Sequence, residues 1–115
     1  MGNKWLRPDE SFTQNLADGA LSYTTVIARR SRLDHAYFKS TVAITEVGTV
    51  TLVSALGSAY DVVLFSRTLS SAQSFSFRPE GDVLLQAGDA IKIECTNANV
   101  TGTVSGAIKM SELYG

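Results

Sequence analysis

The clearest pattern in the chain is a strict alternation of apolar and polar residues near the C-terminus. In the segment 90–96, AIKIECT, Ile91, Ile93 and Cys95 share one parity and polar residues occupy the other. Because successive side chains of a β-strand point to opposite faces, this pattern predicts a strand with one buried and one solvated face.

Similar segments recur along the chain and are separated by turn residues at roughly ten-residue spacing, a pattern typical of antiparallel sandwiches and barrels. The segment 61–69 differs because its first half is apolar on both parities, which predicts a central strand that is covered on both sides. No segment has the period of an amphipathic helix. We therefore predict an all-β, antiparallel, eight-stranded jelly-roll-like β-sandwich. The predicted strands are 21–29, 36–45, 49–56, 61–69, 74–78 and three strands within 83–110, joined by a turn at 87–89 and a loop at 97–102.

The apolar parities of these strands also predict the core. Gly106 occupies an in-phase position of the last strand, where a missing side chain indicates a bulge or a close backbone approach. The predicted core residues are Phe38, Val42, Ile44, Val50, Leu52, Leu64, Phe75, Phe77, Ile91, Ile93, Val104 and Ile108.

Residues 1–20 follow no regular period, and we expect an irregular N-terminal arm ahead of a β-sandwich domain at 21–115. Two interpretations are open for this arm. It is either a lead-in whose Trp5 covers one end of the core, or a segment that docks on a neighbouring subunit, because isolated aromatic side chains need a surface to bury against. Under the second interpretation Trp5, Leu6 and Phe12 are candidate partner-binding residues.

Charge and composition narrow the class of protein. Charged residues make up 18% of the chain and the net charge is −1, which argues against nucleic acid or a membrane surface as partner. The single cysteine excludes an internal disulfide and a multi-cysteine metal site. The chain shows no signal peptide and no apolar run of membrane-spanning length, so synthesis in the cytosol is expected.

Candidate catalytic residues are few. His35 is the only histidine, and Ser31, Asp34 and His35 suggest a triad, but neighbours on a strand point to opposite faces. A Cys95–His35 pair is conceivable, yet Cys95 shares the apolar parity of its strand and is expected to be an inert core residue. We therefore expect no enzyme, no catalytic residue, no metal site and no cofactor.

The remaining polar residues have local explanations. Asp82 and Asp89 lie in turns, where an aspartate side chain accepts backbone hydrogen bonds. Arg29, Arg30 and Arg32 form the one basic cluster, in a predicted loop at 29–34, and are candidates for an interface with a partner protein.

The segment LLQAGDAIKI (84–93), followed after a polar loop by TVSGAI (103–108), resembles late strands of small jelly-roll domains in tailed-phage virions. Such domains occur in head decoration or cement proteins, head spikes and tail-associated receptor-binding parts. The L-x-A-G-D-x-I-x-I pattern covers about a tenth of the chain and also occurs in trimeric tumour-necrosis-factor-like domains and sugar-binding modules.

The resemblance implies a non-enzymatic virion structural protein, made in the host cytoplasm, that bridges capsomers as a capsid decoration protein. The implied partner is the major capsid protein or another virion protein, and the implied assembly is a homotrimer. The alternative function is a head spike or tail-associated module that binds a carbohydrate receptor. That alternative needs an exposed aromatic platform, for which Tyr23, Tyr37 and Tyr60 are the candidates.

Overall fold

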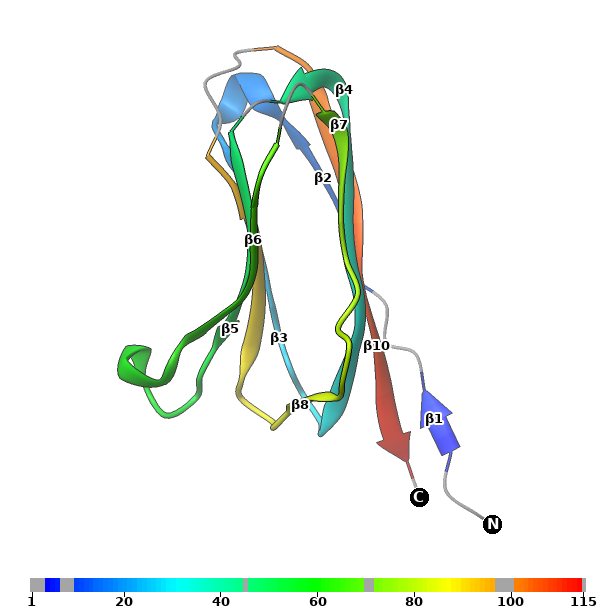
Figure 1. Ribbon diagram of the computed structural model, residues 1–115. Coiled ribbons are helices and arrows are strands. Elements are labelled where there is room, and N and C mark those ends of the chain that lie inside the picture. The colour runs from blue at the N-terminus through cyan, green and yellow to red at the C-terminus, as the bar shows by residue number, and fades with distance from the viewer. Residues whose placement is uncertain (1–3, 7–9, 45, 70–71, 97–100, 115) are drawn as a thin grey trace.

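The computed structural model describes residues 4–6, 10–44, 46–69, 72–96 and 101–114, and within them the chain forms ten β-strands in two antiparallel sheets (Figure 1). The only helical segments in these ranges are two short 3₁₀ turns, η1 (Leu16–Asp18) and η2 (Ser58–Tyr60). The strands are β1 (Lys4–Leu6), β2 (Glu10–Asn15), β3 (Leu21–Val26), β4 (Ser31–Ile44), β5 (Val47–Val53), β6 (Val62–Thr68), β7 (Ala72–Phe77), β8 (Val83–Leu85), β9 (Ala90–Cys95) and β10 (Thr103–Tyr114).

The ten strands fill four positions in each sheet. In the first sheet, sheet A, β1 and β2 lie along one edge of β10, β4 pairs with the other edge of β10, and β7 and β8 lie along the far edge of β4. In sheet B the order is β3-β9-β5-β6. From β2 onward the chain crosses between sheets at each connection, except within the β5–β6 hairpin and the β7–β8 link. The predicted all-β, jelly-roll-like sandwich is confirmed, with ten strands in the described residues in place of eight because β1 and β2 lie in the segment expected to be irregular.

The core lies between the two sheets and contains every residue predicted for it. Eight of the twelve are buried, and Val42, Leu52, Leu64 and Phe77 are partly buried and pack against them. Gly106 lies where β10 passes β4 and β2 most closely: a Cβ atom there would meet the Tyr37 carbonyl and would approach Phe12 Cζ to 2.7 Å. The close backbone approach predicted for this glycine is therefore confirmed.

The expectation of an irregular segment up to residue 20 is wrong for residues 4–6, which form β1, and for residues 10–18. Strand β2 pairs with β10 from Glu10 to Asn15, and Phe12 and Leu16 are buried in the core. Gln14 occupies the intervening inward parity, and its amide binds the Gly19 and Ala20 carbonyls. Because this inward-facing residue is polar, the sequence of β2 does not show the alternation of apolar and polar residues that predicts a strand.

One further boundary differs from the predicted one, and the strand that begins there carries a bulge. The basic loop expected at 29–34 is shorter, because β4 begins at Ser31 and includes Arg32 and Asp34. Asp34 is the extra residue of a β-bulge, since Lys109 pairs with His35 and Met110 with Leu33.

The segment predicted as a central strand is instead the edge of sheet B. Strand β6 pairs with β5 alone among the described strands, and Val62 and Val63 are 48% and 60% exposed. Its apolar residues on both parities are therefore not explained by burial within one copy of the chain.

Candidate functional site

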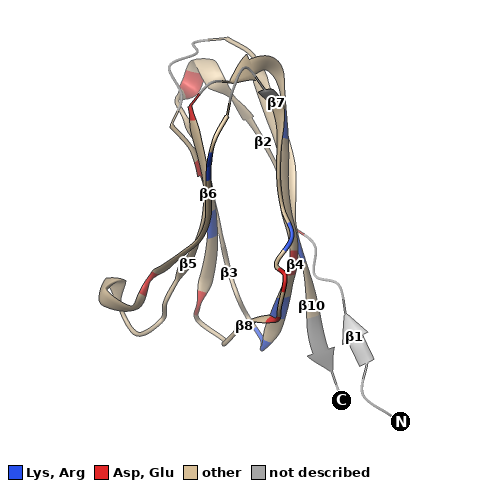
Figure 2. Cartoon of the chain, viewed as in Figure 1, with Lys and Arg blue, Asp and Glu red and all other residues tan. Residues whose placement is uncertain are grey.

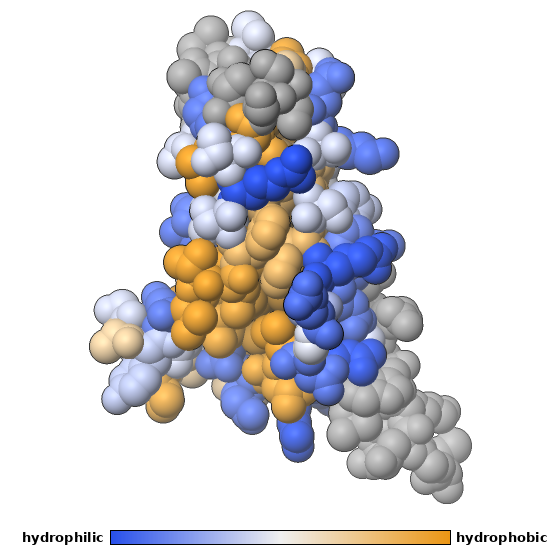
Figure 3. All heavy atoms as spheres, in the orientation of Figure 1, coloured by the Kyte–Doolittle hydropathy of each residue, from blue (hydrophilic) through white to orange (hydrophobic). Residues whose placement is uncertain are grey.

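One side of the sandwich is open, because both sheets end there in edge strands. Sheet B ends in β6, and sheet A ends in β7 and β8. These edge strands lie on the side that faces the viewer in Figure 1. Figure 3 shows apolar residues gathered in the middle of this side, with hydrophilic residues around them. We call this side of the molecule the open edge.

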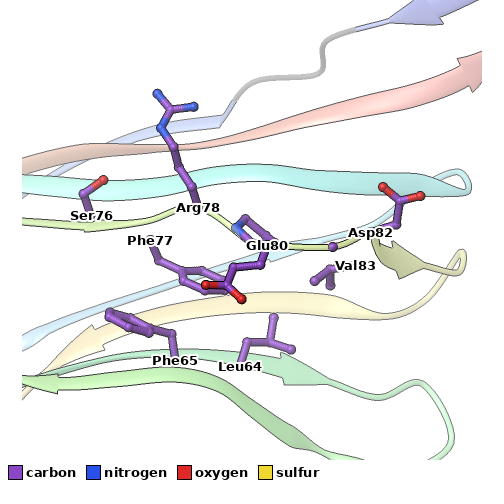
Figure 4. Close-up of a pocket in the computed structure, with 10 residues that line it drawn as sticks. Leu64, Phe65, Ser76, Phe77, Arg78, Glu80, Asp82 and Val83 are labelled. Carbon is purple, nitrogen blue, oxygen red and sulfur yellow. The ribbon is translucent and has the colours of Figure 1, made fainter.

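A groove of about 530 Å³ lies in the open edge between the two sheets. In Figure 4 the side chains of Leu64, Phe65, Phe77 and Val83 point toward one another across it, whereas Arg78, which directly follows β7, points away from them. Its rim is formed by the turn 78–82, which contributes two exposed carboxylates, Glu80 and Asp82. The groove thus has an apolar floor and an acidic rim.

A ladder of four phenylalanines connects the groove to the core. Phe77 stacks on Phe65 with ring centroids 4.9 Å apart, Phe65 contacts Phe75 at 5.7 Å, and Phe75 stacks on Phe38 at 4.9 Å. Phe38 and Phe75 are fully buried, while Phe65 and Phe77 are half-buried at the open edge. The floor of the groove is therefore fixed by the packing of the core.

Exposed apolar side chains continue from the groove onto the β5–β6 hairpin. Of the six large hydrophobic side chains that are exposed in the described part of the chain, four lie in this hairpin: Leu56, Tyr60, Val62 and Val63. A bulge at Leu64, between the pairs Thr51–Val63 and Val50–Phe65, brings Leu64 and Phe65 together at the groove. We call these four hairpin residues together with Leu64 and Phe65 the hairpin surface.

Two aspartates hold the hairpin in shape. The Ser54 backbone N–H donates to Asp61 Oδ1 at 2.8 Å, which closes the loop that carries Leu56 and Tyr60. Asp89 accepts from the backbone N–H groups of Ala55 and Gln86, both at 2.9 Å, and so ties the hairpin to the β8–β9 turn. The turn role expected for Asp89 is confirmed, while Asp82 is exposed on the groove rim.

The predicted partner-binding residues lie in four different places in the fold. Phe12 does not belong on a surface: it is 9% exposed and stacks on Tyr23 with ring centroids 4.8 Å apart, so its assignment to a partner-binding surface is corrected. Arg29 and Arg30 are exposed in the β3–β4 turn. Arg32 lies in β4, where its Nε donates to Asp34 Oδ1 at 3.0 Å, and Ser111 donates to the other Asp34 oxygen.

Trp5 and Leu6 lie in β1, and their side chains fall outside the described part of the structure. Their strand pairs with the end of β10, where Glu112 is opposite both Leu6 and Ser31. Strand β1 and the β3–β4 turn with Arg29 and Arg30 therefore lie at the same end of sheet A. This proximity could not be predicted from the sequence, because it depends on the pairing of three distant segments.

The candidate catalytic residues are arranged differently from a triad. The bulge at Asp34 puts both Asp34 and His35 on the outer side of sheet A, because Leu33 and Ala36 are the buried residues that flank them. His35 Nε2 is hydrogen-bonded to Ser76 Oγ at 2.7 Å, and Ser31 donates to the Arg29 carbonyl. Burial, with the positive charges of Arg78 and Lys109 nearby, lowers the pKa of His35 and so favours the neutral ring.

Cys95 is 2% exposed in the core. Burial, reinforced by the nearby negative charge of Glu46, raises the pKa of its thiol to about 11. The thiolate that nucleophilic chemistry requires is therefore scarce at neutral pH. Within the described ranges no cluster of three or more His, Cys, Asp or Glu side chains is arranged to hold a metal ion.

The three tyrosines named as a candidate sugar platform lie apart. Tyr23 is on the inner side of its strand and donates a hydrogen bond to Glu10. Tyr60 is exposed in the hairpin surface. Tyr37 is on the outer face of sheet A, where its ring stacks on His35.

Comparison with known proteins does not assign the chain to a family. No model of a known protein family matches it, and a search of curated proteins found no match. Of the residues described, none forms a helix with the length and apolar character that crossing a membrane would require.

Proposed function

We propose that the chain is a non-enzymatic structural protein that works by adhesion, as a decoration or cement protein on a phage capsid. The observation that carries the proposal is the hairpin surface, which concentrates exposed apolar side chains beside the groove on one side of a small sandwich. Contiguous exposed apolar patches are typical of protein–protein contact sites. The resemblance of segments 84–93 and 103–108 to virion jelly-roll domains supports the specific role.

In this proposal the open edge is the contact between copies of the chain. Edge strands β6, β7 and β8 present backbone groups and apolar side chains that a neighbouring copy would cover. Asp61 and Asp89 hold the hairpin in one conformation, so little conformational entropy would be lost when it docks. A closed ring, as in a homotrimer, removes all such edges from solvent.

The capsid footprint in this proposal is the end of sheet A that carries β1 and the β3–β4 turn. Trp5, Leu6, Arg29 and Arg30 share this end through the pairing of Glu112 with both Leu6 and Ser31. Three such footprints on one trimer would bind the repeated lattice of a capsid cooperatively, so weak individual contacts would suffice to bridge capsomers.

The test begins with the solution mass of the purified protein, measured by light scattering behind a sizing column. A trimer is expected, and it should bind capsids of the encoding virus that were assembled without it. Val63→Lys should shift the mass to that of the monomer, because it places a charge in the hairpin surface. Ser22→Lys, exposed on β3 at the opposite edge of sheet B and paired with Glu94, should leave the trimer intact.

A monomer for the wild type would refute the assembly proposed for the open edge. A trimer that does not bind these capsids would refute the decoration role and leave the assembly standing.

A further inference from the structure

The outer face of sheet A carries a second surface, which meets the open edge at Ser76 and Arg78. Strands β10, β4 and β7 lie side by side there, and their outward parity brings Lys109 opposite His35 and Tyr37 opposite Ser76. A shallow depression of about 450 Å³ lies over these strands, within the roughly 300–1,000 Å³ range of ligand sites in proteins. Its polar lining residues are His35, Tyr37, Lys39, Ser74, Ser76, Arg78 and Lys109.

Two rings form a platform in this depression. The His35 and Tyr37 rings stack with centroids 4.8 Å apart and an interplanar angle of 28°. The hydrogen bond between His35 Nε2 and Ser76 Oγ fixes the imidazole against β7. The tyrosine is half-buried, so part of its ring and its hydroxyl are available to a ligand.

Three cations surround the platform. Lys39, Arg78 and Lys109 come from three different segments, and all line the same depression. Figure 4 shows Ser76 and Arg78 on the side of β7 away from the groove, and Figure 2 marks the basic positions along this sheet. No carboxylate lines the depression among the described residues, and Asp34, further along β4, is bound by Arg32 and Ser111. This concentration of positive charge stands out on a chain with net charge −1.

We propose that the outer face of sheet A binds an anionic saccharide, whose ring stacks on Tyr37 and whose acidic groups bind Lys39, Arg78 and Lys109. An aromatic ring beside serine hydroxyls suits the apolar face and hydroxyl groups of a sugar, and the cations select for carboxylate or sulfate. Nucleic acid fits less well. Binding along a sugar-phosphate backbone requires a longer series of cations and stacking rings, whereas this depression has one aromatic platform and three positive charges. The proposal does not depend on the capsid role, since it uses none of the residues of the hairpin surface.

The experiment is binding of the full chain to an array that carries sulfated, sialylated and uronate-containing glycans beside neutral glycans of the same length. Retention of acidic glycans and not of their neutral counterparts is expected. Titration calorimetry with the strongest of these glycans should then show that Lys109→Gln and Arg78→Gln each weaken binding about tenfold, because each removes one charge-assisted contact.

Two matched variants separate this site from non-specific attraction of a polyanion. Tyr37→Ala should weaken binding about tenfold without changing the charge of the face, whereas Tyr37→Phe keeps the ring. Lys92→Gln removes a lysine from the outer face of sheet B, where Lys92 pairs with Glu94 at 3.4 Å, and should leave affinity unchanged.

The proposal is overturned if no acidic glycan is retained, or if neutral glycans are retained equally well. It is also overturned if Lys92→Gln weakens glycan binding as much as Lys109→Gln does. Binding of a single-stranded oligonucleotide of equal charge as tightly as the glycan would overturn it as well.

Discussion

Ile93 lies on the central strand β9 of sheet B, between Tyr23 on β3 and Val50 on β5, and its side chain is fully buried. Replacing it by Asp places a charge in the core without a partner, at a cost of several kcal/mol against a total stability of about 5–15 kcal/mol. We expect Ile93→Asp to be unfolded at 25 °C, as measured by circular dichroism and thermal melting.

Thr24→Asp is the matched control for this substitution. Thr24 is exposed on the neighbouring strand and is paired with Lys92, so the new carboxylate would face water and a cation. This variant should melt close to the wild type. A folded Ile93→Asp variant with an unchanged melting temperature would contradict the position of Ile93 in the core.

At the level of single residues, the sequence predicted burial correctly wherever apolar and polar residues alternate regularly along a strand. Ile91 and Ile93 alternate with Lys92 and Glu94, and the structure buries the two isoleucines completely. Asp34 was not predictable in this way, because a bulge adds one residue to the strand and changes the parity. The sequence signal for such a bulge is weak, since it depends on the register of the partner strand.

The elements at the N-terminus change what a truncation is expected to do. Strand β2 covers one edge of β10, and Phe12 and Leu16 fill part of the core. Deleting residues 1–20 should therefore destabilise the sandwich by several kcal/mol, since loss of one buried Phe or Leu side chain alone costs about 2–5 kcal/mol. Urea unfolding followed by circular dichroism measures the loss.

Deleting residues 1–9 separates the fold from the proposed capsid footprint. This shorter truncation keeps β2 and removes Trp5 and Leu6, so the chain should fold and bind capsids less tightly. If the longer truncation were as stable as the wild type, β2 would contribute little to the core.

Strand β6 shows why an element can be predicted in type and misplaced in the sheet. Its apolar residues on both parities predicted a strand correctly, and burial on both sides by the same chain was the wrong explanation. An apolar pattern indicates that a side chain avoids water, but it does not indicate which molecule covers that side chain. The groove could not be predicted for the same reason, because β7, β8 and β6 meet only through the sheet topology.

Among the described residues, three groups have pKa values shifted from their ordinary values, and each shift contributes to the pH dependence of stability. Burial lowers the pKa of His35 below 6.5, with Arg78 and Lys109 adding to the effect. Burial raises the pKa of Cys95 from 9.0 to about 11, and burial and Glu10 raise the pKa of Tyr23 above 10.0. The folded state therefore favours the neutral form of all three side chains.

The free energy of unfolding should consequently be highest between about pH 6.5 and 9, since stability falls wherever the unfolded chain gains or loses a proton first. As the pH falls below 6.5, the unfolded chain protonates its histidine before the folded chain does, and stability is lost. As the pH rises from 9 toward 11, the unfolded chain ionises its thiol first, and stability is lost again. Urea unfolding at each pH from 5.5 to about 10.5 measures this profile. His35→Gln should reduce the loss of stability below pH 6.5, and Cys95→Ala should reduce the loss above pH 9. If the slopes of the free energy of unfolding against pH are unchanged in these variants, other groups cause the pH dependence.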